Sequence, residues 1–315
     1  MTRLHAAIDI GSNTLRLLIA ELPDPSSPEA WEKIAHAQRI TRLGQGLHAN
    51  GCLDEAGIVR ALAALKEFSE ILRQHRLGPE GVYAVATAAV REAVNGHEFV
   101  ERCRMETGIK VQVIDGNTEA RLSLRGAAAV LSTDTSHDML LFDIGGGSTE
   151  FIRVRDGNIA DDISCKLGVV RLIEAHLNSD PPSADSYQAM LATASGHLDE
   201  VEAHWGDRHP PAYLVGTAGT ITTLAALHMD LFPYDADKIN NHAIPLDDFL
   251  ALKDRLLKMT HAERAGLRTV ETGREDLIIA GLAITETIMQ RWNYSELISV
   301  DAGLLQGAWL QTAKA

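Results

Sequence analysis

One short pattern occurs twice in the amino-acid sequence and constrains the fold more than any other feature. Residues 9–14 read DIGSNT and residues 143–149 read DIGGGST, and each segment lies between two short apolar runs. A glycine turn between two apolar strands predicts a β-hairpin. Because the pattern is repeated in the second half of the chain, we expect two similar halves that face each other across a cleft.

The rest of the chain alternates between strand and helix patterns. At 315 residues it is longer than most single cores, so two α/β domains are expected. Apolar runs predict strands near Ile34–Leu43 and at Val82–Ala86, Val111–Ile114, Met139–Ile144 and Tyr213–Val215. Start and stop signals predict helices after Asp54 and Asn95, from Asn117, and over Arg274–Gln290, with a proline-rich turn at Pro23–Pro28.

The two glycine turns are candidate phosphate-binding sites. A glycine-rich turn lets backbone N–H groups approach an anion without obstruction by side chains. Ser12, Asn13, Ser148 and Thr149 add hydroxyl and amide donors. A single turn of this kind is better explained as an ordinary tight hairpin, but two matched copies, each preceded by an aspartate, favour phosphate binding instead. Neither is a Walker loop or a Rossmann turn, because no Gly-Lys-Ser/Thr follows and the next element is a strand.

Charge and cysteine content exclude several functional classes. The chain has 29 basic and 43 acidic residues, a net charge of −14, which argues against non-specific binding of duplex nucleic acid. No apolar stretch approaches the ~20 residues of a membrane helix, and no signal-peptide pattern begins the sequence. The three cysteines form no Cys-x-x-Cys pair, so we expect a reducing, cytoplasmic location and neither a disulfide framework nor a zinc site.

Longer motifs resemble one protein family nearly end to end. They are AAIDIGSNTLRLLIAE near the start, RLGQGL from Arg42, AVATAAVREAVN from Ala84, IDGNTEARL from Ile114, FDIGGGSTEFI from Phe142, KLGVVRL from Lys166, VGTAGTITTLAAL from Val215 and GREDLIIAGLAI from Gly273. The chain resembles the short members of the exopolyphosphatase and guanosine pentaphosphate phosphohydrolase (Ppx/GppA) family. The resemblance implies an α/β fold of two actin-like (ribonuclease H-like, ASKHA superfamily) domains with an interdomain cleft. The implied domains are residues 1–124 plus 303–315, and residues 125–302.

The resemblance also implies the residues of the site. Glu119 and Glu150 match the family's two catalytic acids, and water attack on a phosphoanhydride requires a carboxylate to orient and deprotonate the water. Asp143, at a strand end, is expected to bind Mg²⁺ (or Mn²⁺) with Glu150. The expected phosphate-binding residues are Arg91, Gly11, Ser12, Asn13, Gly145, Gly146, Gly147 and Ser148. Taken alone, Glu119 is also consistent with a first-turn helix glutamate, and Arg91 with a surface ion pair.

Other positions are weaker candidates. Asp9 either binds a metal or accepts N–H bonds from its own turn. Residues 216–220 correspond to the loop that contacts adenosine in the superfamily's ATPases, or they only join a helix to a strand. The further candidates for the site and its positive lining are Arg16, Gly216, Thr217, Gly219, Arg274, Arg121, Lys166 and Arg171. Two departures from the family pattern are Thr118, which replaces an acidic residue, and Leu305-Gln306, which replaces Arg-Glu.

The expected activity is hydrolysis of the terminal phosphoanhydride bonds of inorganic polyphosphate, which releases orthophosphate. Guanosine pentaphosphate is the alternative partner, either as a second or as the main substrate. An actin-like ATPase or small-molecule kinase is disfavoured by the paired Glu119 and Glu150. A catalytically weak polyphosphate or alarmone sensor stays open because of Thr118. We expect neither a duplex nucleic-acid partner nor a membrane, and a homodimer is left open.

Overall fold

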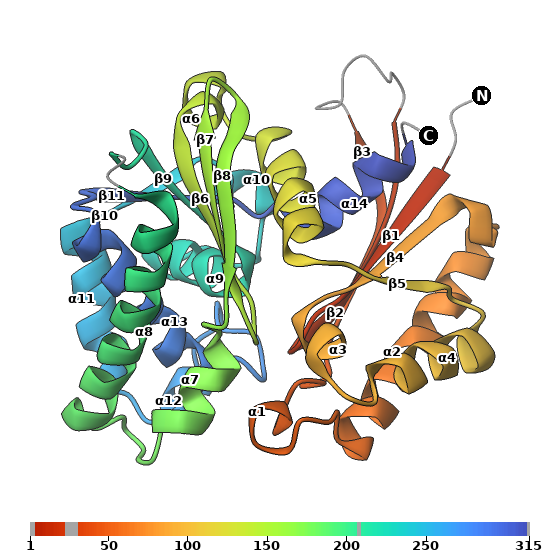
Figure 1. The fold of residues 1–315 in the computed structure, drawn as a ribbon, viewed down its shortest axis with the longest axis horizontal. Helices are drawn as coiled ribbons and strands as arrows, with labels where there is room; N and C mark the ends of the chain where they lie inside the picture. Colours follow the sequence, from red (N-terminus) through yellow and green to blue (C-terminus); the bar gives the residue numbers. More distant parts are fainter. Residues whose placement is uncertain (1–3, 23–30, 207–208, 314–315) are drawn as a thin grey trace. The chain divides into compact units, whose positions relative to one another are not determined.

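The computed structural model describes residues 4–22, 31–206 and 209–313, so the predicted turn at Pro23–Pro28 lies outside the described residues. The chain divides into two compact units. The first comprises Met1–Ala129 with Ala302–Ala315, and the second comprises Val130–Asp301. Each unit is built around its own sheet (Figure 1).

The first unit contains a mixed sheet with the strand order β3-β2-β1-β4-β5. Antiparallel pairing joins β1 (Leu4–Ile10), β2 (Thr14–Glu21) and β3 (Glu32–Ile40), whereas β4 (Val82–Ala86) and β5 (Val111–Val113) continue the sheet in parallel. Successive side chains of β1 point to opposite faces of the sheet and pack in two different hydrophobic cores, Ile8 in one and Ala7 in the other. Both faces of this sheet are therefore buried.

Four helices cover the two faces of the first sheet (Figure 1). One core contains side chains of α2 (Glu55–Gln74) and α4 (Gly96–Thr107), and the other contains those of α5 (Gly116–Ala128) and α14 (Leu304–Ala313). A Cβ atom at Gly307 would lie 1.8 Å from the carbonyl oxygen of Leu122, so glycine allows α5 and α14 to touch. The shorter elements are α1 (Leu47–Asn50), η1 (Pro79–Gly81) and α3 (Ala88–Glu92).

The second unit repeats the topology of the first. Its sheet has the order β10-β11-β9-β6-β7-β8. The strands are β6 (Met139–Ile144), β7 (Thr149–Arg155), β8 (Asn158–Cys165), β9 (Tyr213–Thr217), β10 (His242–Pro245) and β11 (Glu296–Ser299). Read from β8 to β11, the strands have the same order and relative directions as β3 to β5. The prediction of two similar halves is confirmed.

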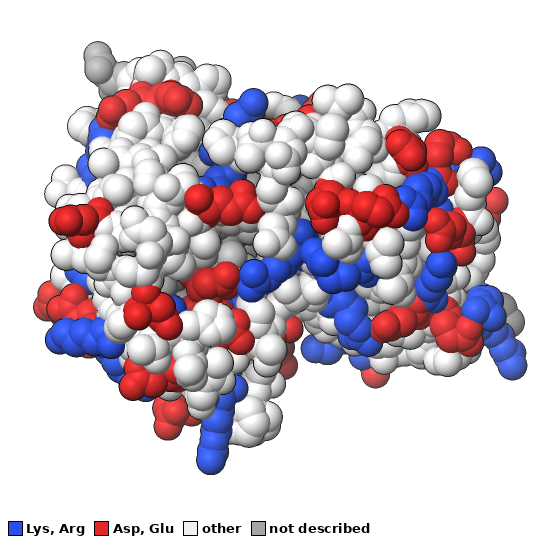
Figure 2. Space-filling model, turned by 90° about the horizontal axis from the view of Figure 1, so that it is seen from below, with Lys and Arg blue, Asp and Glu red and all other residues white. Residues whose placement is uncertain are grey.

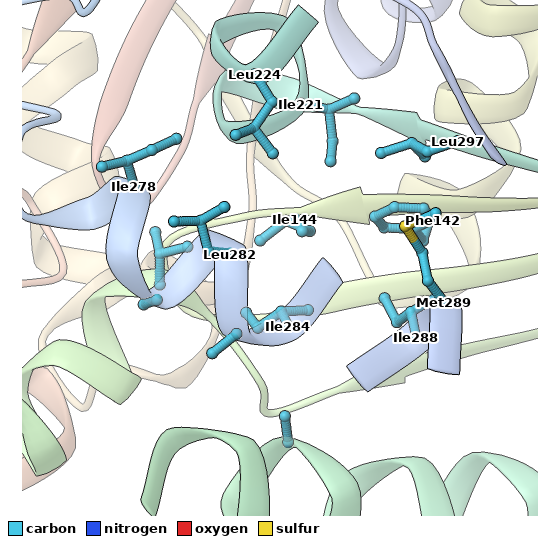
Figure 3. Packing of buried hydrophobic residues seen from close by; sticks show 14 of the residues in the cluster. Phe142, Ile144, Ile221, Leu224, Ile278, Leu282, Ile284, Ile288, Met289 and Leu297 are labelled. Carbon is cyan, nitrogen blue, oxygen red and sulfur yellow. The ribbon is translucent and has the colours of Figure 1, made fainter. Parts of the chain in front are cut away.

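Helix α13 (Leu277–Arg291) lies at the centre of the second unit's core (Figure 3). Every residue from Leu277 to Met289 is buried, and Figure 3 shows the Met289 side chain next to Phe142 of β6. The other helices are α6 (Thr133–His137), α7 (Val169–His176), α8 (Ala184–Trp205), α9 (Ala218–His228), α10 (Ala236–Ile239), α11 (Leu246–Leu257) and α12 (His261–Ala265). Within the described ranges, no helix combines the length and the apolar character needed to cross a membrane.

Two predicted boundaries differ from the structure. The helix predicted from Asn117 begins at Gly116, because the carboxylate of Asp115 caps it by accepting a hydrogen bond from the backbone N–H of Thr118. The strand predicted near Ile34–Leu43 ends at Ile40, where the chain turns toward the first glycine turn.

Candidate active site

The second hairpin places Asp143 and Glu150 next to each other. The two residues are directly opposite in the antiparallel pairing of β6 and β7, so their side chains project from the same face of the sheet. Both are buried, with exposed fractions of 9% and 2%. Two like charges directly opposite each other are unfavourable without compensation. This pair is therefore suited to bind a cation.

Two serine hydroxyls fix the orientation of the Glu150 carboxylate. Ser148 Oγ and Ser164 Oγ each donate to Glu150 Oε1 over 2.8 Å. Ser164 lies opposite Glu150 on β8, a relation that the sequence pattern did not reveal. Ser148 was predicted to bind phosphate, but its hydroxyl is used by Glu150, which leaves the backbone N–H of Ser148 for that role.

The carbonyl groups of the second turn face the start of α7. Gly145 and Gly146 accept hydrogen bonds from the backbone N–H groups of Val169 (3.1 Å) and Val170 (2.9 Å). A Cβ atom at Gly168 would lie 2.3 Å from the Gly146 carbonyl oxygen, so only glycine permits this close approach. The packing fixes the turn as a rigid backbone structure.

The N–H groups of the same turn are available to an anion. Arg171 Nε donates to the carbonyl oxygen of Gly147 over 2.6 Å, which adds a cation beside the turn. In the described part of the chain, the backbone N–H groups of Gly146 and Gly147 make no hydrogen bond. Successive free N–H groups of this kind form a nest that binds phosphate. The second turn therefore has two N–H groups that can donate to an anion, and phosphate binding by residues 145–148 stays a prediction.

The first hairpin has the same layout with a different charge. Arg16 lies directly opposite Asp9 on β2, and its Nε and Nη2 donate to Asp9 Oδ2 over 3.1 and 2.7 Å. Asp9 Oδ1 and Asn13 Oδ1 are buried and have no hydrogen-bond partner among the described residues. Leaving such atoms unpaired destabilises a fold, so a ligand or water that donates a hydrogen bond would stabilise this turn. Asp9 is thus an arginine-paired residue, which weakens it as a metal ligand.

Glu119 and Arg91 are in direct contact. Glu119, in the first turn of α5, is 6% exposed and accepts a hydrogen bond from Arg91 Nη1 over 3.0 Å. The same Nη1 also donates to the carbonyl oxygen of Ile114 over 2.8 Å. Arginine has five N–H donors, so Arg91 can hold Glu119 in place and still present its Nε and Nη2 to a phosphate.

The helix cap below Glu119 involves Thr118. Hydrogen bonds from the side chain and backbone of Thr118 hold the pKa of Asp115 below its usual value. Thr118 thus stabilises the start of α5, where the family has an acid.

The second departure from the family pattern, Leu305-Gln306, lies in α14. Leu305 packs in the core, and Gln306 Oε1 accepts a hydrogen bond from the N–H of Gly303 at the start of α14.

The weaker candidates fall into packing and surface positions. A Cβ atom at Gly216 would lie 2.7 Å from the Phe142 ring, so this glycine has a packing role. Thr217 is the neighbour of Asp143 in the pairing of β6 with β9. A Cβ atom at Gly219 would overlap the guanidinium of Arg274, which therefore lies across the first turn of α9. Arg121 and Lys166 are exposed.

The donor set restricts the choice of metal. In residues 4–22, 31–206 and 209–313, no group of three or more His, Cys, Asp and Glu side chains could hold a metal ion. Mg²⁺ and Mn²⁺ need only one or two carboxylates, with water and substrate phosphates as the remaining ligands, whereas structural zinc needs four protein ligands. Asp143 and Glu150 therefore fit Mg²⁺ or Mn²⁺.

Comparison with known proteins identifies the family. A model of the Ppx/GppA phosphatase family matches residues 25–315. The chain belongs to the Ppx/GppA phosphatase family. Exopolyphosphatase 2 of Mycobacterium tuberculosis is 33% identical to it over 330 residues, which cover 99% of each protein.

Solved structures of Ppx/GppA proteins have the same fold. The Aquifex aeolicus family member is 31% identical, with a TM-score of 0.80 over 99% of this chain and 97% of the other. An exopolyphosphatase from Cytophaga hutchinsonii is 29% identical, with a TM-score of 0.86 over 97% of this chain and 96% of the other. With the two matching sheets, these likenesses confirm the predicted class of two actin-like α/β domains in a hydrolase of the Ppx/GppA family.

Proposed function

We propose that this Ppx/GppA protein is an exopolyphosphatase, which hydrolyses the terminal phosphoanhydride bonds of inorganic polyphosphate and releases orthophosphate. The observation that carries the proposal is the buried Asp143–Glu150 pair beside the glycine turn 145–148. A carboxylate oriented by two hydroxyl donors lies next to backbone N–H groups that can bind phosphate. The Mycobacterium relative is named for polyphosphate hydrolysis, which supports this substrate class.

In this proposal the chain's own residues bind the phosphate and activate water. The N–H groups of Gly146 and Gly147 donate to the terminal phosphate and stabilise the charge that develops on it. Glu150, oriented by Ser148 and Ser164, accepts the proton of the attacking water. Glu119 is the second catalytic acid, held by Arg91, whose remaining N–H groups bind phosphate oxygens.

A divalent cation fits the same residues. Asp143 and Glu150 would hold Mg²⁺ or Mn²⁺, which would neutralise charge on the transferred phosphate when bound. Neutralisation matters because the whole chain has a net charge of −14. Figure 2 shows that basic side chains are nevertheless interspersed among the acidic ones on the face that it draws.

We also infer a cytoplasmic location. Cys52, Cys103 and Cys165 are all free thiols. A reducing compartment keeps thiols in this state.

A phosphate-release assay tests the proposal. The purified chain with Mg²⁺ is given long-chain polyphosphate, tripolyphosphate, guanosine pentaphosphate or ATP at equal concentrations. We expect the fastest release from long-chain polyphosphate. Faster release from guanosine pentaphosphate would instead favour the nucleotide as main substrate, and preference for ATP would favour the ATPase alternative. Binding of polyphosphate without release from any substrate would identify a sensor.

A further inference from the structure

Arg42 has a backbone conformation that arginine rarely adopts. Its φ is 48°, in the left-handed region. This conformation costs a bulky residue energy, so it persists only where the surrounding structure enforces it. The backbone N–H groups of Thr41 and Arg42 both donate to the carbonyl oxygen of Asn13 over 2.9 Å, and that of Gly44 donates to Ser12 over 2.7 Å. Three backbone hydrogen bonds therefore enforce this conformation and attach residues 41–44 to the first glycine turn.

The attachment is tightly packed. A Cβ atom at Gly44 would lie 3.0 Å from Ser12 Cβ and 3.3 Å from Ala89 Cβ, so residues 41–44 lie directly against the turn. Arg60 Nε donates to the carbonyl oxygen of Thr41 over 2.7 Å, which brings a second guanidinium to the same segment. The segment thus combines close contact with the turn and local positive charge.

Two unpaired polar atoms lie beside these hydrogen bonds. Thr41 Oγ1 and Asn13 Oδ1 are buried and have no hydrogen-bond partner among the described residues. Thr41 is only 1% exposed and Asn13 only 8%. Native structures pair most such atoms with protein, water or ligand. Of the two, only the Thr41 hydroxyl can donate to a phosphate oxygen, so Thr41 Oγ1 points to a ligand on this side of the turn, whereas Asn13 Oδ1 accepts and would need a donor such as water.

We propose that Arg42 is a substrate-binding residue that contacts the phosphates of a polyanion bound at the first glycine turn. The left-handed backbone at residue 42 is the means by which the turn sets the position of this guanidinium. A guanidinium matches the geometry of a phosphate and forms strong, charge-assisted hydrogen bonds with it. This inference rests on the proposed polyphosphate activity.

The test compares Arg42→Gly with Arg76→Gly. Arg76 is also an arginine of the first unit with positive φ (57°), and it is exposed, so both substitutions remove a guanidinium and suit the backbone equally. We expect Arg42→Gly to raise KM for polyphosphate by about tenfold to a hundredfold, to change kcat less than about threefold, and to melt within a few degrees of the wild type. Arg76→Gly should leave KM unchanged. Arg42→Lys, which keeps the charge, should have an intermediate KM, and added salt should narrow the difference between Arg42→Gly and the wild type.

Wild-type KM in Arg42→Gly, or an equal rise in Arg76→Gly, overturns the proposal. If the wild type does not hydrolyse polyphosphate, the proposed function fails and Arg42 is tested separately. Calorimetric binding of tripolyphosphate to the wild type and to Arg42→Gly then decides. Weaker binding by the variant supports the role of Arg42, whereas equal affinity, or no binding by either protein, overturns it.

Discussion

The two glycine turns have the same backbone arrangement in their separate units. In the first, the N–H of Gly11 donates to the carbonyl oxygen of Thr14 over 3.1 Å, and in the second the N–H of Gly145 donates to that of Ser148 over 2.9 Å. Each turn joins the central strand of a sheet to an antiparallel neighbour. The shared arrangement shows that the repeat in the sequence is also a repeat of local structure.

The turns differ in the charge of one side chain. The residue opposite the strand-end aspartate is Arg16 for Asp9 and Glu150 for Asp143. The first pair is an ion pair with Arg16 Nη2 2.7 Å from Asp9 Oδ2, whereas the second pair consists of two buried acids. One turn is therefore neutralised by the protein itself, and the other is suited to a cation. The difference teaches that the chemistry of this repeated fold depends on single side chains at fixed register positions.

Removal of divalent metal should have the largest effect, because the proposed cation binds at the second turn, where Asp143 and Glu150 lie opposite each other. After exhaustive chelation we expect phosphate release to fall to background, since the charge of the phosphates would be uncompensated in a chain of net charge −14. Added Mn²⁺ should restore activity and bind at about one site per chain. Phosphate release and calorimetric titration check this, and full activity after chelation would contradict it.

Exchange of the differing side chain gives a sharper form of the metal test. Glu150→Arg should recreate in the second turn the ion pair that Asp9 and Arg16 form in the first, and should abolish Mn²⁺ binding in a folded protein. Asp9→Asn is the matched control and should bind Mn²⁺ as the wild type does. If Asp9→Asn loses Mn²⁺ binding and Glu150→Arg keeps it, the metal binds at the first turn and the proposal is wrong.

Loss of the proposed catalytic acids should have the next largest effect. We expect Glu150→Gln and Glu119→Gln each to lower turnover by about two to four orders of magnitude, the range for loss of a positioned acid or base. Melting should change little, because an amide oxygen still accepts the hydrogen bonds. Glu98→Gln is the control for Glu119, since Glu98 is an exposed first-turn glutamate of α4. If Glu119→Gln and Glu98→Gln have equal turnover, Glu119 has no catalytic role and only stabilises its helix.

Equal substitutions in the two turns should cost equal stability. A Cβ atom would lie 3.0 Å from a backbone carbonyl oxygen at both Gly11 and Gly145, and neither glycine has a left-handed φ. We expect Gly11→Ala and Gly145→Ala each to lower the free energy of unfolding by about 1 kcal/mol. If the turns bind phosphate, polyphosphate affinity should fall by more than about tenfold, a larger loss than the stability change explains. Urea denaturation and binding measurements separate the two effects, and unchanged affinity in a folded variant would exclude that turn from the site.

The sequence predicted the hairpins well because their signals are local. The predicted bounds of β4 and β6 agree with the structure, since each strand is a short apolar run that ends at polar or glycine residues. The contacts that hold the candidate acids could not be predicted in this way. Ser164 meets Glu150 only through the register of β7 and β8, and Arg91 reaches Glu119 from a different helix.

Helix starts show the same limit. Asn95 occupies the predicted cap position, but its side chain bonds the backbone N–H (2.8 Å) and carbonyl (3.0 Å) of Leu53 instead of its own helix. The α5 helix was predicted to start at Asn117. The structure instead places the cap at Asp115, whose carboxylate accepts a hydrogen bond from the N–H of Thr118. In both cases the hydrogen bonds of the cap depend on geometry that residue type alone does not give.

The smallest expected effect comes from the helix cap near Glu119. The hydroxyls of Ser148 and Ser164 orient Glu150, whereas Glu119 lies in the first turn of a helix that Asp115 caps. The Thr118 hydrogen bonds lower the pKa of Asp115 from its ordinary 3.8. A carboxyl group with a lowered folded-state pKa stabilises the fold above its unfolded-state pKa, and this stability is lost as the pH falls through the folded-state value. We therefore expect the wild type to lose melting temperature below about pH 4 faster than Asp115→Asn, whose amide caps without titrating. Turnover at neutral pH should change less than about threefold, because Arg91 still holds Glu119. Melting curves recorded across this pH range check the prediction, and parallel curves for the two proteins would show that the Asp115 cap does not contribute to acid sensitivity.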